Sequence, residues 1–346
     1  MPRSRLAGAT VRRAAIIAAR LAKAKHGIIL CYHGLVTGSA GNGIGGHVSV
    51  DEFRDTIDAA CSAGRAVSLR ELVSRSLTGR STTGLFAVTF DDAFVSLTQP
   101  AARGVISAYQ LPISIFVVTR ASASGTPFWW DRIEALHRQL SAEEWEAFER
   151  RIDLPSEFRT PAAMAFGPLR PFRQWVLSRH AGRLPQPVED VVASLSLIDS
   201  SRDMQRPMTF DEIDRFVEEG RVDVGIHTVS HPVLPLLADD EISEEIRSSY
   251  MTLRERWPSA LPLLAAPFGL YDERTVSISR ALGLSGILNL HPATLELASA
   301  AHGFPRVGIS GATRSWRIAI RLSAFSRFAA ALQSRTVNYP PLPTPD

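Results

Sequence analysis

Two adjacent carboxylates, Asp91 and Asp92, follow the apolar run at 85–88 and the pair Thr89-Phe90. A continuous apolar run bounded by turn signals is typical of a buried strand in a parallel sheet. One aspartate at a strand end is explained by helix capping, because Asp is a good N-cap residue. A cap needs only one carboxylate, and two so close raise each other's pKa unless a cation separates their roles. The pair therefore indicates chemistry as well as structure.

Two histidines with a spacing of four, His227 and His231, follow a second short strand expected at 222–226. If this stretch makes a turn of helix, both rings can face one point. A single histidine would more often be a core residue, but two at a strand end indicate metal ligands. One aspartate and two histidines leave positions open for water, as catalytic zinc sites require. Non-haem iron uses the same ligand set, so the ligands alone do not select the metal.

With these two motifs the sequence resembles the polysaccharide deacetylases of carbohydrate esterase family four, the nodulation-factor deacetylase type. The resemblance extends from about residue 28 to residue 309, and its motifs occur in the family's order. They are Cys31-Tyr32-His33-Gly34, Thr89-Phe90-Asp91-Asp92, His227-Thr228-x-x-His231, Pro267-Phe268-Gly269 and Phe304-Pro305-Arg306-Val307.

The resemblance implies a role for each residue of the two metal motifs. Asp91 is expected to be the general base, and Asp92, His227 and His231 are expected to hold a divalent metal. Zn²⁺ is the first choice, with Co²⁺, Mn²⁺ or Ni²⁺ as alternatives. The cation would keep Asp92 ionised, so that Asp91 stays free to accept a proton. It would also acidify water and polarise an acyl oxygen, helped by a backbone N–H of the 267–269 turn.

The base-orienting group and the general acid have less specific signals. Many members of the family orient the base with an arginine before the Pro-aromatic pair, where this chain has Ala265-Ala266. Arg306 is the candidate replacement, and a structural surface arginine is the alternative. His291, in a late Leu-x-His, and His302 are the two candidates for the general acid that protonates the leaving amine.

Five residues are candidates for substrate contacts. His33 ends the first strand and would line the floor of the site or bind substrate, although a single histidine is equally well explained as structural. Pro267 and Phe268 form the turn beside the metal. Trp129 and Trp130 could stack on a sugar ring, although core packing is the more common role of such a pair.

Strands alternate with helical stretches along most of the chain, which predicts βα units and a parallel sheet. The expected fold class is α/β, an irregular (β/α)7 barrel as in the resembling family, with a mostly helical insertion. Its site would lie at the C-terminal strand ends. We expect a basic N-terminal segment at 1–26 and the barrel at 27–312, with the insertion at 131–206. A C-terminal amphipathic helix and a Pro-rich tail occupy 313–346.

The composition suits a globular protein, with 346 residues of which 45% are hydrophobic and 21% charged. A formal net charge of +3 gives no indication of a nucleic-acid partner. Cys31 falls in a strand, and Cys61 is predicted on one helical face with Phe53 and Ile57. Both cysteines are therefore expected in the core without a disulfide, which fits a reducing compartment.

Both terminal segments are basic. Residues 1–25 contain seven Lys or Arg and no acidic residue, and their apolar part is too short for a good signal peptide. A cationic helix on anionic lipid and a solvated basic tail are the two interpretations. The helix expected at 318–332 either docks on the barrel or lies on a lipid surface. We expect a cytoplasmic protein with a candidate peripheral contact at the inner membrane.

The leading hypothesis is a metal-dependent hydrolase that removes N-acetyl groups from amino sugars of a bacterial polysaccharide or lipid-linked glycan. An acetylated glycan is therefore the expected partner. The same site could act as an O-acetyl esterase, because the chemistry barely differs. A non-catalytic glycan-binding barrel is the alternative from another class. The missing arginine favours that alternative, whereas the presence of Asp91 beside three metal ligands argues against it.

Overall fold

The computed structural model describes residues 27–38, 46–158, 169–194, 205–290 and 303–309. The predicted segments at 1–26 and 313–346 lie outside the described residues, as do both candidate general acids, His291 and His302.

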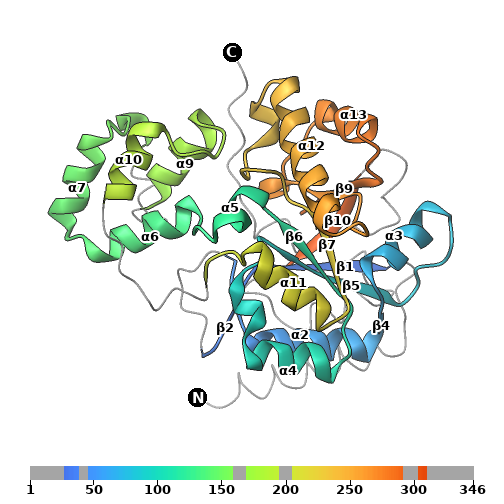
Figure 1. The fold of residues 1–346 in the computed structure, drawn as a ribbon. Coiled ribbons are helices and arrows are strands. Elements are labelled where there is room, and N and C mark those ends of the chain that lie inside the picture. The colour runs from blue at the N-terminus through green and yellow to red at the C-terminus, as the bar shows by residue number, and fades with distance from the viewer. Residues whose placement is uncertain (1–26, 39–45, 159–168, 195–204, 291–302, 310–346) are drawn as a thin grey trace, which may run out of the picture.

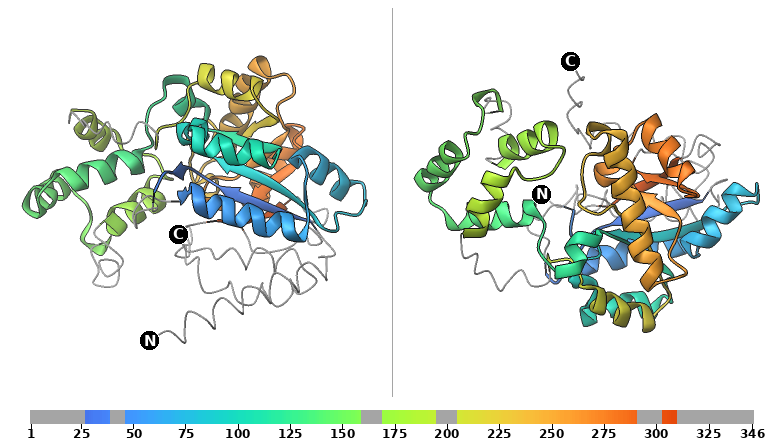
Figure 2. Two further views of the ribbon diagram at one scale, coloured as in Figure 1. Left: turned by 90° about the horizontal axis from the view of Figure 1, so that it is seen from below. Right: turned by 45° about the horizontal axis from the view of Figure 1, so that its top comes forward.

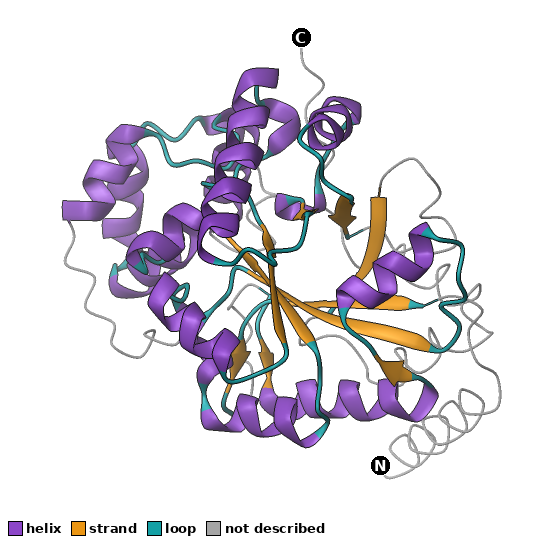
Figure 3. Cartoon of the chain, turned by 45° about the vertical axis from the view of Figure 1, so that its right-hand side comes forward, coloured by secondary structure: helices purple, strands orange, loops and turns teal. Residues whose placement is uncertain are grey.

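Seven parallel strands close into a barrel. The strands follow one another in the order β1-β10-β9-β8-β7-β6-β5, and β5 pairs again with β1, which completes the ring. The short strand β4 pairs with the start of β5, and β2 with β3 makes a separate small sheet. The predicted (β/α)7 barrel is therefore confirmed, and Figure 3 shows its strands surrounded by helices.

The strands of the structure have the following bounds: β1 (Ile28–Tyr32), β2 (Leu35–Val36), β3 (Val48–Ser49), β4 (Arg65–Ala66), β5 (Leu85–Asp91), β6 (Ile113–Val117), β7 (Val222–Ile226), β8 (Leu263–Ala265), β9 (Gly286–Asn289) and β10 (Gly303–Gly308).

The α-helices have these bounds: α2 (Val50–Ala63), α3 (Leu69–Leu77), α4 (Pro100–Ala108), α5 (Thr119–Ser124), α6 (Trp129–Gln139), α7 (Ala142–Arg151), α9 (Leu169–Arg179), α10 (Gln186–Ser194), α11 (Phe210–Glu218), α12 (Asp239–Arg256) and α13 (Glu273–Ala281). Short 3₁₀ helices are η1 (Val95–Thr98), η2 (Ser156–Phe158), η4 (Leu234–Leu236) and η5 (Pro267–Gly269).

The barrel interior is filled by one face of the strands. Ile29, Ala87, Phe116, Leu263 and Phe304 come from five strands and belong to one buried cluster. Because these strands are not all neighbours in the ring, their side chains meet inside the barrel. Successive side chains of a strand point to opposite faces of the sheet. The alternate residues of the strands therefore point outward and pack beneath the helices in a second, larger cluster.

The helices α6, α7, α9 and α10 gather beside the barrel, on the left of Figure 1 and at one side in both views of Figure 2. They have an apolar cluster of their own, which includes Trp145, Phe172 and Trp175. The described residues of the predicted insertion are thus helical and largely self-packed. Its exact limits, 131 and 206, stay a prediction.

Cys31 is buried, but the core position predicted for Cys61 is wrong, because Cys61 is exposed. The buried face of α2 contains Phe53, Ile57 and Ala60 instead. Each step of four residues turns a helix about 40° past a full rotation, so two such steps from Phe53 leave the buried face. Neither cysteine forms a disulfide. None of the helices in the described part of the chain combines the length and hydropathy needed to cross a bilayer.

Gly225 is predicted to be essential for packing inside the barrel. A Cβ at this position would lie 2.4 Å from the ring of Phe116, the residue paired with it on β6. Gly225→Ala should therefore destabilise the fold by about 1–3 kcal/mol through overpacking. Gly104→Ala is the matched control, because Gly104 lies within α4 and its Cβ would meet open space. The control should raise stability by about 0.5–1 kcal/mol. Urea unfolding of both variants checks this, and equal effects would contradict it.

Candidate metal and catalytic site

The end of β5 carries Asp91 and Asp92 into a strained turn. Asp91 is the last strand residue, and Asp92 and Ala93 adopt φ values of 66° and 49°. Left-handed conformations are costly for residues with a Cβ and persist where the surrounding structure demands them. All three residues are buried. The turn redirects the chain so that two consecutive carboxylates both enter the site.

His227 and His231 are brought together by a loop, so the helical turn considered for them is not what forms. His227 follows β7, and its N–H donates to the carbonyl of Val117 at 3.2 Å. Thr228 and His231 then adopt φ values of 67° and 58°. The Thr228 hydroxyl accepts a hydrogen bond from the His231 N–H at 3.0 Å. The two imidazole rings end 4.7 Å apart, centroid to centroid.

Asp92, His227 and His231 converge on one point. The Nε2 atoms of His227 and His231 lie 3.6 Å and 3.7 Å from Oδ1 of Asp92, and all three side chains are buried. Two ligands of one tetrahedral zinc, each about 2.1 Å from the ion, are about 3.4 Å apart. The spacing of the three atoms therefore fits a shared cation.

The environment of the three groups also fits a cation. Burial, followed by the charges of Asp91 and Asp131, raises the pKa of Asp92 well above its usual value. Burial lowers the pKa of His227 to about 4 and lowers the pKa of His231 well below its usual value. His227 Nδ1 lies 2.7 Å from the carbonyl oxygen of Ala265, which directs Nε2 toward Asp92. Oδ1 of Asp92 has no hydrogen-bond partner within the described residues. The pocket thus presents neutral imidazoles and a carboxylate that needs positive charge.

Arg306 forms a bidentate ion pair with Asp91 inside the barrel. Its two terminal nitrogens lie 2.6 Å and 2.7 Å from Oδ1 and Oδ2, and the side chain is fully buried. In the strand register Arg306 is level with Ile29 and Ala87, so its side chain extends along the barrel interior to reach Asp91. This burial excludes the alternative of a surface arginine.

The ion pair sets the charge of Asp91. Burial alone would raise the pKa of Asp91. The charge and hydrogen bonds of Arg306, together with the charges of His227 and His33, outweigh burial and hold that pKa well below its usual range. The pKa of Arg306 is lowered by burial and raised by Asp91, with a net increase. The environment therefore moves the pKa values of the two adjacent carboxylates apart. Asp91 is ionised, whereas Asp92 favours the protonated form until a cation binds.

Two further groups interact with Asp91, namely Cys31 in β1 and His33 just after that strand. The Cys31 thiol lies 3.5 Å from Oδ2 of Asp91, and burial raises its pKa, so it remains a thiol. His33 lies two residues after Cys31, and its positive charge lowers the pKa of Asp91. Burial lowers the pKa of His33. The structure thus gathers Asp91, Arg306 and His33, which lie far apart in the sequence.

The aromatic candidates divide between the site and the insertion. Trp130 stacks on Phe128 and lies 5.0 Å from His231, ring centroid to centroid. Phe268, with φ of 57°, lies 4.6 Å from the same histidine. Pro267 is buried in the turn beside it. Trp129 instead belongs to the core of the insertion helices. Trp130 and Phe268 therefore border the candidate ligands, and Trp129 packs away from them.

Sequence reasoning missed Asp131 and the Ala265 carbonyl. Asp131 is buried in the first turn of α6, and its charge contributes to the raised pKa of Asp92. Its position directly after the aromatic pair was a signal that could have been used. The Ala265 carbonyl could not have been predicted, because every residue has a backbone carbonyl and the residue type does not show which one accepts a hydrogen bond.

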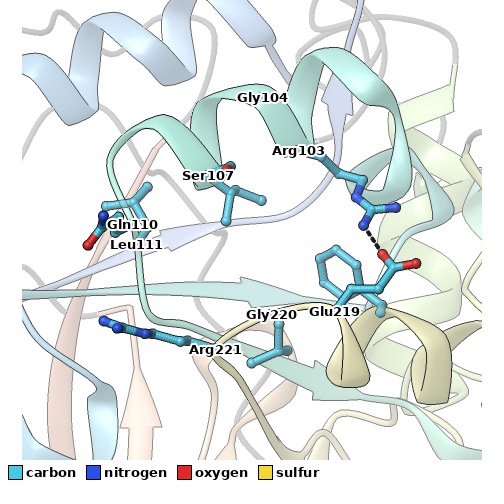
Figure 4. Close-up of a pocket in the computed structure, with 11 residues that line it drawn as sticks. Arg103, Gly104, Ser107, Gln110, Leu111, Glu219, Gly220 and Arg221 are labelled. Carbon is cyan, nitrogen blue, oxygen red and sulfur yellow. Dashed lines mark ion pairs between the residues drawn. The ribbon is translucent and has the colours of Figure 1, made fainter.

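A groove of about 510 Å³ lies elsewhere, between α4 and α11 (Figure 4). Val222, the first residue of β7, and Gly220 line it, and Arg103 pairs with Glu219 across it. These residues are near the N-terminal strand ends, opposite Asp91. The groove is therefore not part of the candidate site.

The buried ion pair makes a prediction about stability. Arg306→Met should cost about 3–5 kcal/mol at pH 7 in metal-free buffer, because Asp91 is left buried and uncompensated. In the wild type the low pKa of Asp91 stabilises the fold above pH about 4, and this contribution is lost as pH falls further. In the variant, burial raises that pKa, so stability falls as pH rises.

The stability deficit of Arg306→Met should therefore be larger at pH 7 than at pH 4, as measured by urea unfolding. The double variant Arg306→Met/Asp91→Asn should recover part of the loss, because it removes the charge left behind. A small deficit that does not vary with pH would contradict the prediction.

Comparisons with known proteins agree with this architecture. The polysaccharide deacetylase family matches residues 189–287, a range that includes His227 and His231. A chitooligosaccharide deacetylase from Bradyrhizobium sp. (strain ANU 289) is 32% identical over 76 residues, 22% of this chain and 34% of that protein. The matched part is thus about a third of the relative's length.

Two solved structures have the same fold. IcaB from Ammonifex degensii has a TM-score of 0.54 at 18% identity, covering 89% of this chain and 98% of that one. The Streptococcus pyogenes deacetylase PplD in complex with acetate has a TM-score of 0.53 at 14% identity, covering 84% and 95%. The sequence matches and the barrel together make this chain similar to the polysaccharide deacetylases.

Proposed function

We propose that this protein is a metal-dependent hydrolase that removes N-acetyl groups from amino sugars of a bacterial polysaccharide or lipid-linked glycan. The observation that carries the proposal is the pairing of Arg306 with Asp91 directly beside the triad Asp92, His227 and His231. A metal site needs only the triad. A second carboxylate, kept ionised by a buried arginine, supplies a proton acceptor at the same place.

Asp92, His227 and His231 are the residues that would hold the cation, and Zn²⁺ suits two imidazoles and one carboxylate. When bound, a divalent cation would supply a more acidic water and polarise the acyl carbonyl. The same donor set also accepts Co²⁺, Mn²⁺ or Ni²⁺.

Asp91 is the proposed general base. Water attacks the acyl carbon, Asp91 accepts the proton that the water loses, and the C–N bond breaks to give acetate and an amine. Each carboxylate oxygen of Asp91 accepts one hydrogen bond from Arg306. Each oxygen keeps a further lone pair, so Asp91 can still accept a proton. Because Arg306 and the neighbouring histidines hold the pKa of Asp91 well below its usual range, the carboxylate is ionised at neutral pH.

The 267–269 turn is the proposed source of a hydrogen bond to the developing oxyanion. The N–H groups of Gly269 and Leu270 donate to carbonyls within the turn. The proposal therefore assigns the oxyanion to the N–H of Phe268, whose left-handed conformation orients that peptide.

His33 is the proposed general acid for the leaving amine. The described groups that lower the pKa of Asp91 by their charge are Arg306, His227 and His33. His227 belongs to the metal triad, and arginine does not release its proton. Burial lowers the pKa of His33, so the imidazole is neutral at pH 7. In this proposal it donates to the amine only after taking up the proton released by the attacking water. This assignment differs from the sequence candidates His291 and His302, which lie outside the described residues.

The aromatic border of the site favours a sugar ring as substrate. Trp130 and Phe268 both lie beside His231, with their ring centroids 6.3 Å apart, and both are part-exposed. Aromatic faces and their polar rims suit the apolar face and hydroxyl groups of a sugar. An O-acetyl group could be cleaved at the same site. The missing arginine before Pro267 no longer favours a non-catalytic barrel, because Arg306 pairs with Asp91 instead.

The proposal predicts that metal binding and turnover can be separated. Wild-type protein should bind one Zn²⁺ per chain and release acetate from N-acetylated glucosamine oligomers, and chelation should abolish turnover. His227→Gln should lose metal binding. Asp91→Asn should keep metal binding and lose about 10²–10⁴-fold in turnover, as expected for a general base. Calorimetric zinc titration and an acetate assay check both. Acetate release from O-acetylated glycans alone would identify an esterase, and binding without any release would support the non-catalytic alternative.

The general acid can be tested by varying the leaving group. An amine must be protonated to leave, whereas the phenolate of an aryl acetate leaves unprotonated. His33→Gln should therefore lower turnover of the N-acetyl glycan by about 10²–10⁴-fold and affect an aryl acetate far less. Equal losses on the two substrates would show that His33 is structural.

A further inference from the structure

Glu245 contacts the loop that carries the two histidines. This residue of α12 is buried, which is unusual for a glutamate unless it is paired. Its Oε2 accepts hydrogen bonds from the N–H groups of Val229 and Ser230, both at 2.9 Å. Its Oε1 accepts from the Ser230 hydroxyl at 2.5 Å. One carboxylate thus holds both central residues of the His227–His231 loop.

The loop needs such a partner because of its backbone conformation. Thr228 and His231 both have positive φ, which directs the N–H groups between them toward the same side. Consecutive N–H groups arranged in this way form a concavity that attracts an anion. In this protein the anion is the side chain of Glu245. Without it, the strained conformation that aims both rings at Asp92 would lose the contact that compensates it.

Arg183 connects the same carboxylate to the insertion. It donates to Oε1 of Glu245 at 2.9 Å, to the Ser230 hydroxyl at 3.3 Å and to Glu241 at 3.2 Å. The adjoining turn adds a backbone contact, since the Ala181 carbonyl accepts from the Val233 N–H at 2.7 Å. The insertion therefore contacts the histidine loop at Ser230 and the chain just after that loop at Val233.

We propose that Glu245 and Arg183 are positioning residues that hold His227 and His231 in the geometry needed to bind metal. Through Arg183 the helical insertion then contributes to metal affinity. This inference rests on the proposed metal site and assigns a role to contacts outside it. Neither side chain is a metal ligand, because both act through the backbone and the Ser230 hydroxyl.

Zinc affinity, measured by competition with a chromogenic chelator, tests the proposal. Removing a group that orients metal ligands typically weakens binding about 10- to 100-fold, and this is the loss expected for Glu245→Ala. Glu245→Gln keeps one acceptor oxygen and loses the charge, so its loss should be smaller. Arg183→Gln should also weaken binding, by less than Glu245→Ala, because Glu245 remains on the loop.

Glu189→Gln is the matched control. Glu189 forms a bidentate ion pair with Arg132 inside the insertion, at 2.6 Å and 2.8 Å, on α10 and away from the histidine loop. It should keep wild-type zinc affinity, even where circular dichroism shows a lower melting temperature. A control that weakens zinc binding as much as Glu245→Ala would overturn the proposal, because general loosening of the insertion would then be sufficient.

The outcomes separate this inference from the proposed function. Wild type that binds zinc, with folded Glu245→Ala within twofold of it, overturns the positioning role and leaves the metal site standing. Wild type that binds no zinc overturns both. If Glu245→Ala does not fold, Glu245→Gln and Arg183→Gln decide, and wild-type affinity in both overturns the proposal.

Discussion

The ion pair between Arg306 and Asp91 is the interaction on which the site depends. A carboxylate enclosed by a barrel is unstable unless a cation is supplied from within the same enclosure. Arg306 supplies it from β10, the strand that pairs with β1. With Asp91 compensated in this way, the adjacent Asp92 remains the group that lacks positive charge. One fixed arginine therefore divides two identical side chains into a permanent anion and a candidate metal ligand.

Strained backbone conformations are concentrated around the candidate ligands. Of the eight residues other than glycine that have positive φ in the described chain, five are Asp92, Ala93, Thr228, His231 and Phe268. All five belong to the three strand-end segments that surround the candidate ligands. Strain of this kind is maintained where neighbouring contacts determine the conformation. The contacts are the barrel ladder on one side and the Glu245 carboxylate on the other.

The helical insertion contacts the candidate site. It has its own apolar cluster, yet Trp130 reaches the ring of His231 and Arg183 reaches the loop behind it. Asp131 also adds its charge to the environment of Asp92. One compact group of helices therefore borders His231 through Trp130 and contacts the histidine loop through Arg183.

The sequence by itself determined the βα units and the parallel sheet, and its resemblance to a known family supplied the barrel. The grouping of Asp92, His227 and His231 followed, because strand-end motifs in a parallel barrel all emerge at one rim. The sequence could not determine how the histidines meet, since a spacing of four also suits a helix, nor which face of α2 holds Cys61. Only the tertiary structure decided that Arg306 compensates Asp91. The two residues are 215 positions apart, and their contact depends on the register of β10 and on side-chain parity inside a closed ring. Local residue type indicates which groups end a strand, whereas closure of the barrel decides which charges face each other.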